Sequence, residues 1–402
     1  MLTTGNLKNI LWLLFCDLSK AFDVINHSIL LQKLNHYGIR GVANKWFENY
    51  LLNRKQYVQI DQSQSNLCKI DCGVPQGSIL GPLLYLIYVN DIDKSTDSKI
   101  LSFADDTSLY ASNMDVKKLF SDVNTSVNLL FEWFCANQLS LNASKTKYIV
   151  IRAPTSHSDM SNLSIKINNT VLERIGSGQT ENSTKFLGII IDEHLTWKYH
   201  LNHINNKISR ALFAIKQMKH ILPQESLRTL YFALIQPHLN YGVLAWGKAN
   251  QAAINKTEML QKKAIRLINK SPYNSHTEPL FKTSEILKLK DLHEYQSLIF
   301  MKDYFSNRLP QSFDNSFPYN REVQSTRVTR QANLLHVEYG MSSFSNNSPL
   351  YILPLIWNKW ANLVSENISR AGFKKNIRSI ILSSYSDSIK CDNLFCKACS
   401  RI

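Results

Sequence analysis

The apolar and polar positions in the first half of the chain predict short strands alternating with amphipathic helices. Residues 11–16 form an apolar run that predicts a buried strand ending at Asp17. Residues 100–103 and 107–110 flank Ala104, Asp105 and Asp106, which predicts a β-hairpin with two adjacent carboxylates at its tip. Helices are expected at 28–37, 43–52, 83–89 and 116–138, and further strands at 56–60, 67–71, 147–152, 164–168, 170–174 and 185–192. These elements predict an α+β fold, with a mixed, mainly antiparallel sheet and helices on one face.

The second half changes to helical periodicity. Ile204, Ile208, Leu212 and Ile215 share one helix face, and helices at 227–234 and 258–268 follow. From about residue 275 the helical segments are interrupted by prolines, and residues 342–348 indicate a loop. We interpret the aromatic residues of this half, Tyr231, Tyr241 and Trp246, as core residues rather than stacking platforms.

The net charge of +15 is concentrated in the second half. Residues 1–199 carry 19 Lys and Arg against 18 Asp and Glu, whereas residues 200–402 carry 27 against 13. Such a basic region suits nucleic-acid binding, although a merely solvated surface would look similar. Four cations of the segment from Glu258 fall near one helix face on which phosphates could dock, and a generic solvated face explains them almost as well: Lys262, Lys263, Arg266 and Lys270.

The seven cysteines indicate a reducing compartment, because their number is odd and the first four are scattered. Cys391, Cys396 and Cys399 are spaced like zinc ligands, but no fourth ligand follows, so free thiols are favoured over a metal. No stretch approaches the roughly eighteen apolar residues of a membrane span. We therefore expect an intracellular protein, in the nucleus or cytoplasm, that has no contact with a membrane.

The carboxylates that end two strands are the candidate chemistry. An Asp-Asp pair in a turn has a purely conformational explanation, since Asp suits turns. If Asp17 and Asp105 reach the same end of one sheet, however, they could hold two divalent ions about 4 Å apart, which can drive nucleotidyl transfer.

Three further segments decide between these interpretations. They are Asp17-Leu18-Ser19-Lys20-Ala21-Phe22-Asp23, then the stretch 73–82 (GVPQGSILGP), and finally 139–146 (LSLNASKT) with 185–188 (KFLG). In this order and spacing, together with the Phe103-Ala104-Asp105-Asp106 segment, they resemble motifs A to E of reverse transcriptases. The resemblance is to the non-LTR (LINE-type, jockey-like) retrotransposons in particular and covers about residues 10–200. Five ordered motifs are far more specific than any one of them.

The resemblance implies an RNA-directed DNA polymerase that copies an RNA template from a DNA primer with deoxynucleoside triphosphates. It implies a palm with a remnant of fingers at 1–200, a helical thumb at 201–275 and a helical region of unknown role at 276–402. It further implies two Mg²⁺ ions, or Mn²⁺ in their place. Asp17 and Asp105 would bridge them, with Asp106 nearby and the main-chain carbonyl of Leu18 as a further ligand.

Other residues receive roles from the same resemblance. Lys145 would protonate the pyrophosphate, with a plain surface lysine as the alternative. Phe22 would exclude a 2′-hydroxyl from the sugar site, with an ordinary core Phe as the alternative. Gln76 and Gly77 would contact the nucleotide and the template backbone. The segment Phe186, Leu187 and Gly188 would grip the primer strand, and a plain β-turn explains it equally well.

One departure from the family affects the expected activity. The fingers segments that precede motif A, which hold the triphosphate, have no counterpart here, and Met1 to Thr4 leave no room for them or for an endonuclease domain. We therefore expect impaired catalysis by residues 1–402. The alternative function is a catalytically inactive nucleic-acid-binding remnant. A maturase-like protein is a third interpretation, and the lack of a recognisable maturase segment argues against it.

Overall fold

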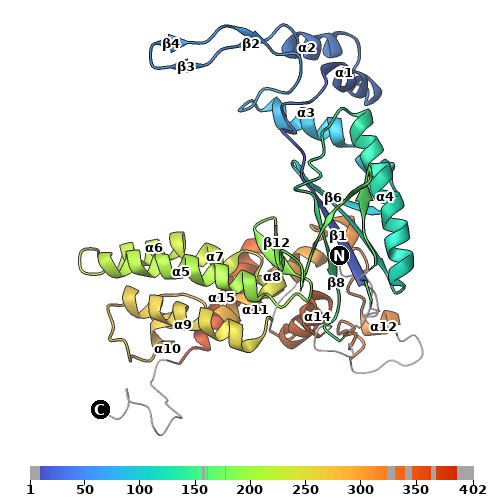
Figure 1. The fold of residues 1–402 in the computed structure, drawn as a ribbon. Helices are drawn as coiled ribbons and strands as arrows, with labels where there is room; N and C mark the ends of the chain where they lie inside the picture. Colours follow the sequence, from blue (N-terminus) through green and yellow to red (C-terminus); the bar gives the residue numbers. More distant parts are fainter. Residues whose placement is uncertain are drawn as a thin grey trace. The chain divides into compact units, whose positions relative to one another are not determined.

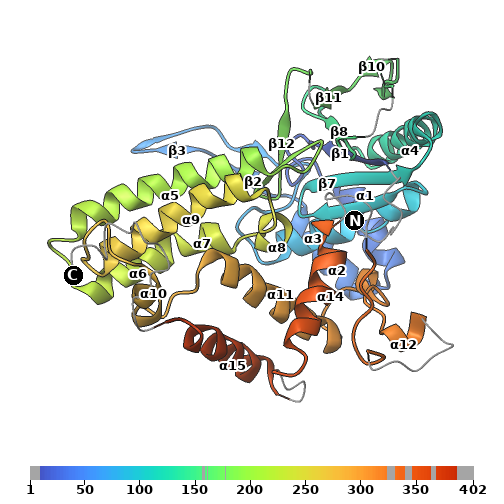
Figure 2. The same ribbon diagram turned by 90° about the horizontal axis from the view of Figure 1, so that it is seen from below.

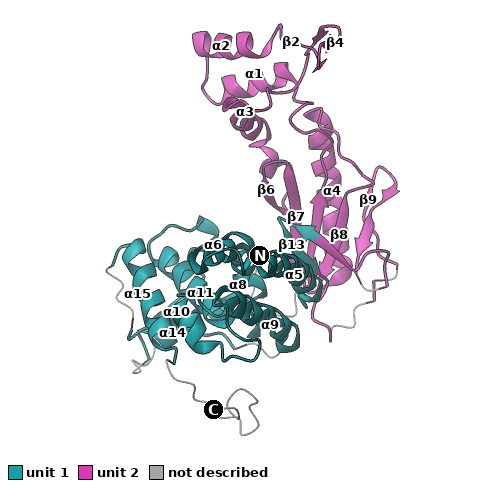
Figure 3. Ribbon diagram, turned by 90° about the vertical axis from the view of Figure 1, so that its left-hand side faces the viewer, with its two compact units in different colours: residues 1–7, 185–191, 195–402 teal, residues 8–184, 192–194 magenta. Residues whose placement is uncertain are grey.

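The computed structural model describes residues 10–155, 159–160, 162–176, 178–323, 331–339, 346–363 and 368–386. The chain divides into two compact units (Figure 3). One comprises residues 8–184 and 192–194, and the other comprises 1–7, 185–191 and 195–402. Cys391, Cys396 and Cys399 lie outside the described residues, so the structure says nothing of the zinc alternative.

A five-stranded sheet forms the centre of the first unit (Figure 1). Its spatial order is β11 (Glu173–Ile175), β8 (Lys147–Ile151), β1 (Ile10–Cys16), β7 (Asp106–Asn113) and β6 (Lys99–Phe103). Every neighbouring pair is antiparallel except β11 and β8, which run parallel. The predicted α+β class with a mixed, mainly antiparallel sheet is therefore confirmed.

The sheet faces a helical layer through alternate side chains of its strands. Trp12 and Leu14 of β1 lie opposite Val150 and Tyr148 of β8, and all four are buried in one hydrophobic core. Helices α3 (Leu80–Val89) and α4 (Val116–Ala136) contribute to the same core. The period-two alternation of a half-buried strand and the 3.6-residue period of α4 place these residues on facing surfaces.

Helices α1 and α2 and several short strand pairs also belong to this unit (Figure 1). Asn26 caps the N-terminus of helix α1 (His27–His36), because its side chain accepts a hydrogen bond from the amide of Ile29. The predicted strand pair at 56–60 and 67–71 consists of two short exposed ladders. The remaining elements are α2 (Gly41–Leu51), β2 (Lys55–Gln56), β3 (Gln59–Ile60), β4 (Ser63–Gln64), β5 (Cys68–Lys69), η1 (Ile92–Ser95), β9 (Lys166–Ile167) and β10 (Thr170–Val171).

The second unit is helical apart from the hairpin of β12 (Ser183–Phe186) and β13 (Ile189–Asp192), whose ends at residues 183–184 and at Asp192 belong to the first unit. Its elements are α5 (Lys198–Met218), α6 (Gln224–Leu234), α7 (Gln236–Asn240), α8 (Val243–Trp246), α9 (Gln251–Ile268), α10 (Glu278–Thr283), α11 (Leu289–Phe305), η2 (Gln311–Phe313), α12 (Asn320–Val323), α14 (Pro349–Trp360) and α15 (Arg370–Ser383). Helices α5 and α9 run side by side (Figure 2).

One hydrophobic core joins these helices from Leu201 to Tyr385. The four apolar residues predicted to share a face of α5 are all buried in it. Buried Gln261 of α9 crosslinks the core, because its side chain donates to the Tyr231 hydroxyl and accepts from the amide of Leu289. The prediction that Tyr241 is a core residue is wrong: Tyr231 and Trp246 are fully buried, but Tyr241 is 56% exposed.

Among the described residues, no helix is long and apolar enough to cross a membrane.

Candidate active site

The three aspartates lie at one end of the five-stranded sheet. Cys16, the last residue of β1, pairs with Thr107 of β7, so Asp17 follows at the level of Asp106 on the neighbouring strand. Asp106 pairs with Phe103 across the hairpin, and Ala104 and Asp105 form its two-residue turn. Ala104 has a φ of 52°, which the tight turn requires. The antiparallel register therefore delivers all three carboxylates to the same edge.

The loop before β8 holds the strand end that carries Asp17. The carbonyl of Asp17 accepts from the amide of Asn142 at 2.8 Å, and the amide of Ser19 donates to the carbonyl of Ser140 at 2.9 Å. Between these bonds, Leu18 forms a bridge with Leu141. In an antiparallel ladder, such a residue directs its own N–H and C=O away from that partner. The carbonyl of Leu18 therefore faces the side on which β7 lies.

Burial and like charge both act on Asp106 at this end of the sheet. The pKa of Asp106 is raised, first by burial and then by the neighbouring charges of Asp105 and Asp17. The ammonium of Lys145 lies 3.9 Å from the Asp17 carboxylate, and both side chains are exposed, so this ion pair contributes little to stability. The structure thus brings Lys145 to the same edge as the aspartates.

Phe22 rests on an aromatic side chain of α3. Its ring centroid lies 4.6 Å from that of Tyr85, with the ring planes at 33°. Tyr85 is 1% exposed, its hydroxyl has no hydrogen-bond partner among the residues that the structure describes, and burial together with the charge of Asp105 raises its pKa. The sequence analysis missed Tyr85, although an aromatic residue in the apolar run 83–89 was the available signal.

The glycine-rich stretch 73–82 packs against the turn that carries Phe22. The side chain of Gln76 donates to the Asp23 carboxylate at 2.7 Å, and the amide of Val74 donates to the carbonyl of Phe22. Gly73 has a φ of +85°, and a Cβ there would lie 2.7 Å from the carbonyl oxygen of Asp23. A Cβ at Gly77 would instead meet open space, so this backbone is accessible from outside.

Phe186 ends β12, and Leu187 and Gly188 form the turn that leads to β13. Leu187 and Gly188 have φ values of 44° and 85°. The hydroxyl of Tyr241 donates to the carbonyl of Leu187. The predicted hairpin is therefore present, with a partner that the sequence did not indicate.

The four predicted phosphate-binding cations do not form one helix face. Lys262 and Lys263 are exposed on α9. Arg266 is half-buried and donates to the carbonyl of Ser275 at 2.8 Å. Lys270 follows the end of α9 in a left-handed conformation, with a φ of 52°. The predicted single face is wrong, because the helix ends before Lys270.

Helix α5 presents a stronger cationic surface. It has no Asp or Glu in 21 residues, and its exposed side includes His203, Lys207 and Arg210. Within the described residues, neither Lys207 nor Arg210 forms an ion pair. Burial together with Lys207 and His203 lowers the pKa of His238 on α7. The absence of acidic residues was visible in the sequence and could have identified this face.

Comparisons with known proteins assign residues 3–191 of the chain to a family. Residues 3–191 match the model of the reverse transcriptase (RNA-dependent DNA polymerase) family. The chain contains a reverse transcriptase domain. The predicted resemblance to jockey-like non-LTR reverse transcriptases is thereby confirmed, as is the nucleotidyltransferase class of the family.

The relatives of this reverse transcriptase domain include proteins of Drosophila mobile elements. The chain is 25% identical over 298 residues to the RNA-directed DNA polymerase from mobile element jockey of Drosophila melanogaster, a match that covers 69% of this chain and 30% of the relative. It is 23% identical over 340 residues to the probable RNA-directed DNA polymerase from transposon X-element of the same species, covering 79% and 35%. The chain thus spans about a third of the length of these relatives.

Among solved structures, apo telomerase from Candida Tropicalis is similar at 12% identity and a TM-score of 0.35, covering 76% of this chain and 51% of that one. At that score the similarity carries no argument.

The oxygen atoms at the end of the sheet that carries the three aspartates are of the kind that binds a divalent cation. Carboxylate and carbonyl oxygens are the ligands that Mg²⁺ prefers. Burial raises the pKa of Asp106 most, and the negative charges of Asp105 and Asp17, which a cation would neutralise, raise it further. In the described part of the chain, no group of three or more His, Cys, Asp or Glu side chains is gathered closely enough to hold a metal ion. The aspartates share an edge without converging on one point.

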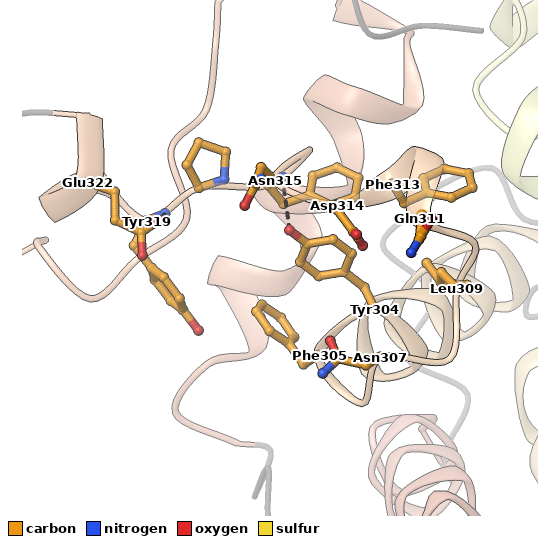
Figure 4. Close-up of a pocket in the computed structure, with 12 residues that line it drawn as sticks. Tyr304, Phe305, Asn307, Leu309, Gln311, Phe313, Asp314, Asn315, Tyr319 and Glu322 are labelled. Carbon is orange, nitrogen blue, oxygen red and sulfur yellow. Dashed lines mark hydrogen bonds between the residues drawn. The ribbon is translucent and has the colours of Figure 1, made fainter.

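A separate pocket of about 630 Å³ lies in the helical unit (Figure 4). Its aromatic lining packs on itself: the rings of Tyr304 and Phe317 are 5.0 Å apart, and those of Phe305 and Tyr319 are 6.1 Å apart. The amide of Phe317 also donates to the hydroxyl of Tyr304. These contacts explain the aromatic residues as packing, and we assign the pocket no role.

Proposed function

We propose that this chain supplies the polymerase site of an RNA-directed DNA polymerase from a jockey-like retrotransposon. Its substrates would be an RNA template, a DNA primer and deoxynucleoside triphosphates. The single observation that carries the proposal is the register of β1, β7 and β6, which delivers Asp17, Asp105 and Asp106 to one edge of the sheet.

Asp17 and Asp105, with the carbonyl of Leu18, are proposed to hold two Mg²⁺ ions, or Mn²⁺ in their place, and Asp106 assists. Such ions, when bound, activate the primer hydroxyl and neutralise the leaving pyrophosphate. The proximity of the Asp105 and Asp17 charges to Asp106 and the direction of the Leu18 carbonyl, away from its bridge partner Leu141, support this assignment. Lys145, which lies 3.9 Å from Asp17, would protonate the pyrophosphate.

Nucleotide selection is proposed to depend on Phe22, Gln76 and Gly77. The support is the packing of Phe22 on Tyr85, because a ring backed by a buried side chain cannot yield when a 2′-hydroxyl presses on it. The hydrogen bond from Gln76 to Asp23 connects the glycine-rich stretch to the same turn. The open space beside Gly77 would admit a template backbone.

The helical unit is proposed to hold nucleic acid. We keep the division into palm, thumb and C-terminal region as a working description, with boundaries near residues 200 and 275. Phe186, Leu187 and Gly188 would grip the primer. Phosphates would contact Lys207 and Arg210 of α5 in addition to the exposed members of the four cations predicted around α9: Lys262, Lys263 and Lys270. Lys207 and Arg210, which are exposed and form no ion pair with any described residue, support this role, since binding releases condensed counterions.

The test is extension of a DNA primer on an RNA template with Mg²⁺, comparing the chain with its Asp105→Asn variant. This change keeps the size of the side chain but removes its charge. We expect slow deoxynucleotide addition by the original chain, in line with the impaired catalysis expected from its sequence, and addition at background level by the variant, with equal affinity for primer–template. Extension that persists in Asp105→Asn would contradict the proposed site. Binding by the original chain without any extension would support the alternative, an inactive nucleic-acid-binding remnant.

A further inference from the structure

The turn of the β12–β13 hairpin has a strained backbone that something must hold. Leu187 has a φ of 44° and Gly188 one of 85°. The left-handed region is unfavourable for a branched residue such as Leu, and this conformation persists only where the surroundings stabilise it. The residues that contact the turn therefore decide where Phe186 and Gly188 lie.

Tyr241 supplies that support with both parts of its side chain. Its hydroxyl donates a hydrogen bond to the carbonyl of Leu187. Its ring covers Gly188, at which a Cβ would lie only 3.2 Å from the ring atom Cε1. Because Tyr241 is nevertheless 56% exposed, the rest of its ring extends the surface of the hairpin rather than filling the core.

The backbone around Tyr241 is fixed in turn. Trp246, which is fully buried, donates from its indole nitrogen to the carbonyl of Tyr241 at 2.8 Å. Gly242 has a φ of +63°, and a Cβ there would lie 2.4 Å from the Cδ1 of Ile189. The junction between α7 and α8 therefore presses directly against the hairpin, and Tyr241 has little freedom to move away from it.

A second anchor holds the other side of the hairpin. The amide of Ile190 donates to the Nδ1 of buried His200 on α5 at 3.3 Å. The His200 ring packs edge-on against Trp246, with centroids 5.9 Å apart. One buried indole thus supports both the Tyr241 and the His200 contacts.

We propose that Tyr241 is a positioning residue that sets the turn of the hairpin and, through it, the place of the primer terminus. This inference rests on the proposed function of the hairpin as the primer grip. A surface tyrosine that only stabilises the fold is the competing explanation. The exposed hydrogen bond argues against it, because water can replace such a bond at little cost in global stability.

The first measurement tests whether Tyr241 stabilises the turn of the hairpin. Tyr241→Phe removes the hydroxyl and keeps the ring, and Tyr273→Phe makes the same change at a tyrosine that is 90% exposed in the same unit. We expect hydrogen exchange of residues 186–190 to accelerate several-fold in Tyr241→Phe, because the turn opens locally more often without this bond. The melting temperature and the Tyr273→Phe control should stay unchanged. Unchanged exchange in Tyr241→Phe would overturn the proposal.

The second measurement tests the consequence for the primer. A primer with a photoreactive 4-thiothymidine at its 3′ end is bound to template and to the chain, and crosslinked peptides are mapped. We expect crosslinks within residues 183–192, with a yield several-fold lower in Tyr241→Phe at unchanged affinity. Equal yields in both proteins would overturn the positioning role. If crosslinks of the original chain map only to other residues, the primer grip is refuted, and with it the inference about the primer. The hydrogen-exchange experiment would still show whether Tyr241 stabilises the turn.

Discussion

The ring centroid of Phe22 lies 4.6 Å from that of Tyr85, and Tyr85 is itself buried. A side chain that excludes a 2′-hydroxyl must resist being pushed aside. Tyr85 gives Phe22 that resistance, because a close-packed interior does not yield without strain. The pair connects the turn after β1 to helix α3, so the proposed sugar selection depends on two segments of the palm.

This relationship predicts how nucleotide discrimination responds to mutation. Phe22→Ala should raise ribonucleotide incorporation while affecting deoxynucleotide use less, because it removes the clash that discriminates. Tyr85→Leu should have a weaker effect in the same direction, and Tyr85→Phe, which keeps the ring, should have little. The measurement is the ratio of kcat/KM for the two nucleotide types, in a polypeptide that extends primers. An unchanged ratio in Phe22→Ala would assign that residue to the core alone.

The cationic face of α5 predicts a change in salt dependence. Replacing Lys207 and Arg210 with Gln should weaken primer–template binding and lower the slope of log K against log salt by about one for each phosphate that these side chains neutralise. Lys374→Gln with Lys375→Gln removes the same charge from α15, where Lys374 lies close enough to Asp303 to lower the pKa of that carboxyl. The slope should change little in this control. Equal reductions of the slope in the two double variants would show that only net charge matters.

The buried histidine behind the hairpin predicts a pH dependence of stability. Burial, assisted by the charge of His203, lowers the pKa of His200 to about 4. Between about pH 6.5 and 4 the unfolded chain therefore binds a proton at this position that the folded chain does not. The free energy of unfolding should fall as pH decreases through this window, by at most about 1.4 kcal/mol per pH unit from this residue.

His200→Gln is the matched variant, since Gln keeps a polar side chain but does not titrate. Urea unfolding at several pH values between 4 and 7 should give a shallower pH dependence for the variant. The same pH dependence in both proteins would show that other groups, such as His293, which also has a pKa near 4, account for it.

The strands and helices that carry the candidate site could be predicted from the sequence because each is local. The apolar run before Asp17 and the alternation around Asp105 depend on residues close in the chain, and β1, β6 and β7 form there. The contacts of Phe22 with Tyr85 and of Leu187 with Tyr241 span 63 and 54 residues, and no local period encodes them. The interpretation of Tyr241 as a core residue was wrong for this reason. The sequence around an aromatic residue does not show whether its ring is buried in the core or covers a turn that is distant in the chain.

The cations around α9 illustrate a second limit. The 3.6-residue period predicted the helix, but the position at which it ends depends on the left-handed residue that follows Asn269. A shift of one or two residues at a helix end is enough to remove Lys270 from the face that contains Lys262.

The central claim is that Asp17 and Asp105, with Asp106, bind divalent metal at the edge of the sheet. Iron-directed cleavage tests it without requiring catalysis: Fe²⁺ in place of Mg²⁺, with ascorbate and peroxide, cuts the backbone near the residues that hold the ion. The account predicts fragments ending near residues 17 and 105, suppressed by excess Mg²⁺ and lost in Asp17→Asn and in Asp105→Asn. Cleavage that is absent at both positions, or that is unchanged in the two variants, would contradict it.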